Sequence, residues 1–222
     1  KWFEQSEKEK NIFKDSIIDY YCLDSNTRLY ITTGKKEFYQ IEQVIPSLAT
    51  AIKIFQENNV DPWFAQSILL IESPAQLKYS SVGAYGPFQI MKSVARDMGL
   101  TINKYVDERK DFNKSAYAAS ELLKRVCIPQ AYRIMCKVGD IEPEGDELWF
   151  KLLVLHIYHA GARNVESLLS QLEEPLQGME LIKWMWINEY GNFKNASQNY
   201  SQIAIAAMLT LKDIVLSDCE YI

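Results

Sequence analysis

Apolar residues recur at helical spacing in one segment after another of this 222-residue chain. In residues 38–57 they fall four, three and four positions apart, which puts a single stripe on one helix face: Val44, Leu48, Ala51 and Phe55. Similar patterns predict helices over residues 63–71, from 111 onward, and over 149–159, 179–190 and 200–216. We therefore expect a mainly α fold of about eight to ten helices.

The helix over residues 63–71 has the clearest start signal. Asp61 stands at the N-cap position, and Pro62 occupies the first helical position, where its missing N–H does no harm. The residues that follow are almost all apolar, which predicts a buried central helix. Asp111 is a similar cap for the helix that follows it.

Two stretches have little helical pattern. Residues 23–38 contain a β-leaning run that ends at Gly34, so a short strand pair is expected there. Residues 137–145 mix acids with two glycines and a proline, which is typical of a surface loop. Residues 1–40 match no motif, and we expect an N-terminal extension over 1–40 and a domain over 41–222.

The charge and hydropathy of the chain exclude several classes of function. Its net charge of −5 and the absence of a Lys/Arg tract argue against nucleic acid as a partner. No apolar run reaches the roughly 18 residues that a membrane helix needs, so no transmembrane span is expected. The polar start at Lys1 leaves open whether a lipid anchors a preceding segment, and the sequence does not indicate an oligomeric state.

Cysteine and histidine spacing does not favour a metal site. The four cysteines form no CxxC pair, although their even number is compatible with two disulfides: Cys22, Cys127, Cys136 and Cys219. The two histidines lie three residues apart with no third ligand nearby. We expect no bound metal.

Glu72 is the first candidate for chemistry. It ends the apolar helix, and a carboxyl in apolar surroundings loses hydration, which raises its pKa toward the range of a general acid. The alternative is that Glu72 is the solvated end of a buried helix.

The segment after Glu72 contains a turn rich in small residues, SSVGAYG at 80–86. Small side chains and free backbone N–H groups could line a groove there. We expect Pro87 to start another helix that carries Gln89 and Met91, an amide able to bind a sugar and a thioether able to pack on it. The alternative roles are a capping amide and a core methionine.

Three motifs in this order resemble the soluble lytic transglycosylase catalytic domain of glycoside hydrolase family 23: Glu72-Ser73, GAYGPFQIM at 83–91, and Tyr158-His159-Ala160-Gly161. The run at 106–111 is similar to the membrane-bound type D branch, and NASQNYSQIAI at 195–205 resembles the late family segment in which a tyrosine borders the cleft. The likeness covers roughly residues 44–216.

This resemblance implies a lysozyme-like domain, of the goose-type lysozyme and lytic transglycosylase kind, that cleaves the β-1,4 bond between N-acetylmuramic acid and N-acetylglucosamine in peptidoglycan. Glu72 would be the single catalytic acid, with no cofactor, and a 1,6-anhydromuramyl end would form. The implied substrate-binding residues are Ser73, Gly83, Ala84, Gln89, Met91, Tyr158, His159 and Tyr200. Such a substrate implies a bacterial protein that is periplasmic or associated with the outer membrane.

Other readings stay open. One is a peptidoglycan-binding scaffold with weak or no turnover, a second is a lysozyme-type hydrolase, and a third is an all-α interaction module. His159 stands where the family usually has Asn, which could make affinity depend on pH. Four aromatic residues could form a sugar-stacking platform but are expected in the core: Trp149, Trp184, Trp186 and Tyr190.

Overall fold

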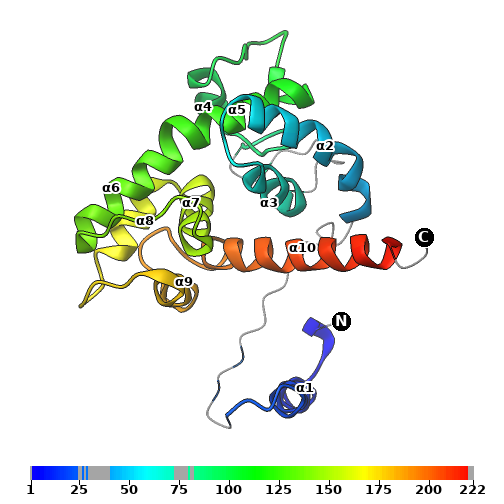
Figure 1. The fold of residues 1–222 in the computed structure, drawn as a ribbon, viewed down its shortest axis with the longest axis vertical. Helices are drawn as coiled ribbons and strands as arrows, with labels where there is room; N and C mark the ends of the chain where they lie inside the picture. The colour runs from blue at the N-terminus through cyan, green and yellow to red at the C-terminus, as the bar shows by residue number, and fades with distance from the viewer. Residues whose placement is uncertain are drawn as a thin grey trace. The chain divides into compact units, whose positions relative to one another are not determined.

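Helices dominate the computed structural model of the protein, which describes residues 2–24, 27, 29, 41–72, 80 and 83–219 (Figure 1). Contacts divide the chain into two units, Lys1–Thr33 and Gly34–Ile222. In the first unit, α1 (Glu7–Tyr20) begins with a capping box in which the Ser6 hydroxyl accepts from Glu9 N–H and the Glu9 carboxylate accepts from Ser6 N–H.

The second unit carries the other helices. They are α2 (Ile41–Glu57), α3 (Pro62–Glu72), α4 (Lys92–Asp97), α5 (Phe112–Leu122), α6 (Ile128–Gly139), α7 (Leu148–Ala160), α8 (Ala162–Leu169), α9 (Gly178–Ile187) and α10 (Ala196–Cys219). Ten α-helices thus lie in the described part of the chain, and its extended segments meet only in isolated β-bridges. The mainly α prediction is confirmed.

The core is built around α3 and α7, the two most apolar helices. Both α2 and α10 pack on α3, and α10 also packs on α7 (Figure 1). Asp61 accepts a hydrogen bond from Trp63 N–H at 2.8 Å, as expected of an N-cap. The helical stripe of α2 is buried as predicted, from Val44 to Phe55.

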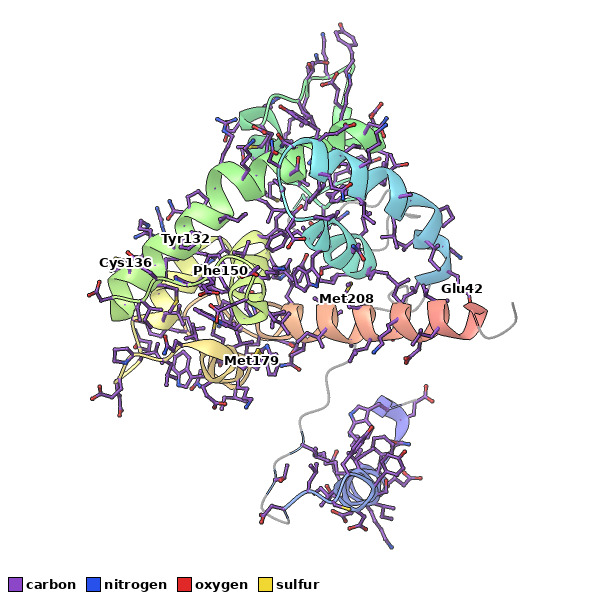
Figure 2. The ribbon with its side chains drawn as sticks, in the orientation of Figure 1. Glu42, Tyr132, Cys136, Phe150, Met179 and Met208 are labelled. Carbon is purple, nitrogen blue, oxygen red and sulfur yellow. The ribbon has the colours of Figure 1, made fainter. Side chains whose placement is uncertain are left out.

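Helix α5 runs on into α6 through a π-helical segment, η3 (Leu123–Cys127). The Asp111 side chain caps α5 by accepting from Lys114 N–H at 2.9 Å, which confirms the predicted start. Further along, the ring of Tyr132 on α6 lies 4.5 Å from that of Phe150 on α7, between centroids (Figure 2). This contact joins α6 to the core.

Several helix boundaries differ from the sequence expectation. Helix α9 ends at Ile187 rather than at 190, because Asn188 is extended. The loop expected from 137 begins later, since α6 continues to Gly139 and ends where Asp140 adopts a left-handed conformation. Most of the β-leaning stretch at 23–38 lies outside the described residues, as do residues 38–40 at the expected start of α2.

The described helices include none with the length and hydropathy of a bilayer span. Cys22, Cys127 and Cys136 are unpaired thiols, and the side chain of Cys219 lies outside the described part. Burial raises the pKa of the Cys127 thiol to about 12, which makes it unreactive at neutral pH.

Candidate functional site

Glu72, the last residue of α3, lines a hollow of about 190 Å³ that we call the Glu72 hollow. Segments far apart in the sequence build it. Its described lining consists of Glu72, Ser80, Ala84, Gln89, Ile90, Met91, Val94, Leu122, Tyr158, His159 and Tyr200. The hollow therefore brings together seven of the residues singled out from the sequence.

Tyr200 is the hydrogen-bond partner of the acid. Its hydroxyl donates to Oε1 of Glu72 across 3.1 Å, from α10 to the end of α3. The phenol is 2% exposed, and burial, followed by the nearby charge of Glu72, raises its pKa well above the usual value. Tyr200 is therefore neutral at physiological pH and acts as a hydrogen-bond donor to Glu72.

Tyr158 also lines the Glu72 hollow, but its hydroxyl donates to the carbonyl oxygen of Phe88, at 2.7 Å. Burial and the charge of Glu72 raise its pKa too, so this phenol stays protonated. Tyr158 thus fixes the segment that carries Gln89 against α7.

The two histidine side chains lie in different surroundings. The exposed His159 ring stacks on the Tyr200 ring, with centroids 4.3 Å apart and planes at 20°. His156 is fully buried, and its Nε2 lies 2.8 Å from the hydroxyl of Ser201, which accepts from the indole N–H of Trp186. Burial lowers the pKa of His156 to about 3, so it is neutral.

No group of three His, Cys, Asp or Glu side chains suited to a metal occurs among the described residues. The aromatic set behaves largely as core: Trp149 is buried, and Trp184 and Trp186 pack against the core. Tyr190 is the exception, being 47% exposed. None of the four lines the Glu72 hollow.

The expected helix from Pro87 is wrong. Tyr85 and Ile90 exchange backbone hydrogen bonds of 3.1 and 3.2 Å around a tight turn, and α4 starts only at Lys92. Gly86 and Gln89 both have positive φ, at +86° and +47°, which a helix does not allow. Gln89 therefore lies on the turn, and Met91 takes the N-cap position of α4.

The small residues of this turn have separate roles. Ala84 is buried and lines the Glu72 hollow, whereas Gly83 lines a second, neighbouring hollow. A Cβ on Gly86 would lie 2.2 Å from the carbonyl oxygen of Arg109, so backbone packing requires the glycine.

Arg109 is a structural residue that the sequence analysis did not single out. Its side chain is 2% exposed and pairs with Asp107 at 2.7 Å, while Nη1 donates to the carbonyls of Gly83 and Ile90 at 3.2 and 3.0 Å. The guanidinium lowers the pKa of Asp107 and keeps it ionised. Arg109 thus holds both ends of the turn that carries Gln89.

Of the expected site residues, Ser73 lies outside the described part of the chain. Ser80 belongs to the turn that was expected to line a groove, whereas sequence reasoning missed Ile90, Val94 and Leu122 as lining residues of the Glu72 hollow. Small and aliphatic side chains of this kind carry no chemical signature, and only the family spacing could have pointed to Ile90.

Comparison with known proteins identifies the family of the chain. The family model of the transglycosylase SLT domain matches residues 49–171, just over half of the chain, from within α2 to just beyond α8. Searches of curated proteins and of solved structures returned no match. The chain therefore belongs to the transglycosylase SLT domain family, whose fold is lysozyme-like and rich in α-helix.

Proposed function

We propose that the protein is a peptidoglycan lytic transglycosylase that cleaves the bond between N-acetylmuramic acid and N-acetylglucosamine, with Glu72 as its single acid and base. The family supports peptidoglycan as substrate. The observation that carries the proposal is the hydrogen bond from the neutral Tyr200 hydroxyl to Glu72 in a hollow whose described lining has no other carboxylate.

In the first step, Glu72 gives its proton to the oxygen of the glycosidic bond as the bond from that oxygen to C1 breaks. The resulting carboxylate keeps the Tyr200 hydroxyl as a donor, which stabilises the negative charge. The acetamido group of the substrate supports the positive charge that develops on the muramic sugar.

In the second step, the C6 hydroxyl of the muramic sugar attacks C1 and returns its proton to Glu72. This closes a 1,6-anhydro ring and consumes no water. Glycosidases with two acids keep them at a defined separation, and a site with one acid fits a reaction in which the substrate supplies the nucleophile.

The other residues of the Glu72 hollow would hold the sugars. The Gln89 amide can bind a hydroxyl or acetamido group, and Met91 offers an apolar surface for a sugar face. His159, on the exposed side of Tyr200, is proposed as a further sugar contact in place of the usual Asn. Ser73 is proposed to orient Glu72 or the substrate.

Mass spectrometry of fragments released from purified peptidoglycan tests the reaction, with wild type compared with Glu72→Gln. Anhydromuramyl ends are expected from wild type and should be absent from the variant. Glu142→Gln, the same change at an exposed loop residue outside the hollow, is expected to leave release unchanged.

Other outcomes select among the alternatives. Reducing muramic ends would identify a lysozyme-type hydrolase, in which water replaces the C6 hydroxyl. Binding to the sacculus without release of fragments would identify a scaffold.

Two finer assignments accompany the proposal. The run at 106–111 favours the membrane-bound type D branch, and the substrate favours a periplasmic or outer-membrane-associated place in a bacterium. Fractionation of cells that produce the native protein would test the second assignment.

A further inference from the structure

A second and larger hollow adjoins the Glu72 hollow. It has a volume of about 700 Å³ and lies between α4 and the segment that leads to Lys110. Met91 lines both hollows, and Gly83 in one is the chain neighbour of Ala84 in the other. A branched ligand seated beside Glu72 can therefore extend a branch into the second hollow.

This second hollow, which we call the basic hollow, carries an excess of positive charge. Five of its lining residues are basic, Lys92, Arg96, Lys104, Arg109 and Lys110, and the one acid, Asp107, is already paired with Arg109. The three lysines are exposed and form no ion pair with any described residue. Such a concentration of charge is notable in a chain of net charge −5.

We propose that the basic hollow binds the anionic peptide stems that branch from the muramic sugars, an inference that rests on the function proposed above. Where a stem is attached, the lactyl carboxyl of the muramic sugar is held in an amide bond and the glycan backbone is uncharged, so the lysines gain little from that backbone. The stems carry carboxylates, which Lys and Arg side chains bind directly. The Lys104 ammonium lies over the ring of Tyr105, 4.7 Å from its centroid, and Tyr105 is itself 83% exposed and lines the basic hollow.

The charge also predicts a preference among substrates. A strand that carries stems binds through two adjoining sites, whereas a strand stripped of its stems keeps only one short lactyl carboxylate on each muramic sugar and binds mainly through the Glu72 hollow. Charge recognition at an exposed site is screened by salt, so the preference is greatest at low ionic strength.

The test measures binding of two soluble tetrasaccharides from peptidoglycan, one with its peptide stems and one without them, by calorimetry. Every protein carries Glu72→Gln so that neither sugar is cut. The test variant adds Lys92→Gln, Lys104→Gln and Lys110→Gln. Its control adds Arg163→Gln, Lys194→Gln and Lys212→Gln, which remove the same charge from exposed positions that line neither hollow.

We expect the test variant to lose about tenfold in affinity for the stem-bearing sugar, with less than about twofold for the bare sugar, because each exposed charge contact is weak. The loss should shrink at high salt, and the control should match its parent. Equal losses on both sugars, no loss on the stem-bearing sugar, or no preference for it in the parent would each overturn the inference.

The binding test and the fragment analysis test the two proposals independently. Selective loss of stem binding, with no anhydromuramyl ends from wild type, would refute the proposed reaction and keep the basic hollow as a stem site. Anhydromuramyl ends from wild type without stem selectivity would support the proposed reaction and refute the basic hollow as a stem site. Circular dichroism of each variant checks that the fold is retained.

Discussion

The buried Arg109 gives the sharpest test of how the turn beside Glu72 is held. Replacement by Met keeps most of the apolar stem but removes every donor of the guanidinium. The carboxylate of Asp107, 14% exposed, loses its ion-pair partner. The carbonyls of Gly83 and Ile90 lose their bonds to Nη1, and Ile90 is only 2% exposed.

Loss of one partner of a buried pair costs about 3–5 kcal/mol, because the remaining charge is left without compensation. The partial exposure of Asp107 lets water reach it, so we expect a loss near the lower end, about 3 kcal/mol in the free energy of unfolding. For a protein of this size that is a fall of roughly 6–12 °C in Tm.

Urea and thermal unfolding of the Arg109→Met variant measure this loss, and the urea slope should not change. Arg125→Met is the matched control, because Arg125 is 56% exposed and its carboxylate partner Glu121 is 3.7 Å away. The control is expected to lose less than about 0.5 kcal/mol. A loss at Arg109 no larger than at Arg125 would refute the reasoning.

The pH dependence gives a second check on the same residue pair. Hydrogen bonding from Arg109 lowers the pKa of Asp107, so the pair stabilises the fold above the usual aspartate pKa and the effect is lost as pH falls through the lowered value. The difference between wild type and Arg109→Met should therefore be full at neutral pH and shrink below about pH 4. If the stability difference between wild type and Arg109→Met stayed constant down to about pH 2, this explanation would be contradicted.

Four further changes are expected to separate chemistry from structure. Tyr200→Phe removes the donor to the acid and should lower kcat/KM for fragment release by about 10–100-fold with the fold retained; a loss under about threefold would contradict this role. Gly86→Ala should cost about 3 kcal/mol or more of stability because its Cβ meets a backbone oxygen, whereas Gly83→Ala, also at positive φ but in open space, should cost only about 1 kcal/mol, and equal costs would refute the packing argument. His156 is held neutral with its pKa lowered to about 3, so the unfolded state gains a proton first and stability should fall as pH drops below about 6.5; His156→Gln should flatten that slope in urea titrations, and an unchanged slope would count against it. His159→Asn should remove a pH dependence of activity between about pH 5 and 8, and profiles that are flat in both proteins would dismiss that role.

Much of the helical framework could be predicted because its signals are local. The stripe from Val44 to Phe55 and the caps at Asp61 and Asp111 depend only on neighbouring residues, and the structure confirms them. Boundaries failed where one residue left the helical region, as at Asn188 beyond α9. Periodicity does not report the conformation of a single residue.

The site could be predicted in part. The motifs placed Glu72, Gln89 and Tyr158 near one another, and the Glu72 hollow contains all three. The turn from Tyr85 to Ile90 could not be predicted, because Pro87 suits both a helix start and a turn, and nothing local indicates the positive φ of Gln89.

Arg109 escaped prediction for a different reason. Because Arg109 stands in a run of charged residues, the sequence indicates a solvated side chain. Two of its partners are backbone carbonyls, which every residue carries and which the sequence therefore does not single out. Only the folded chain shows that these carbonyls converge on one guanidinium.

The hydrogen bond between Tyr200 and Glu72 joins residues 128 positions apart, and α10, which brings Tyr200, lies beyond the segment that the family model matches. A ribosome makes the acid long before it makes the hydroxyl that faces it. A nascent or truncated chain that stops before α10 therefore has Glu72 without its donor and with one wall of the hollow missing. Order of synthesis thus leaves the proposed site incomplete until α10 has been made.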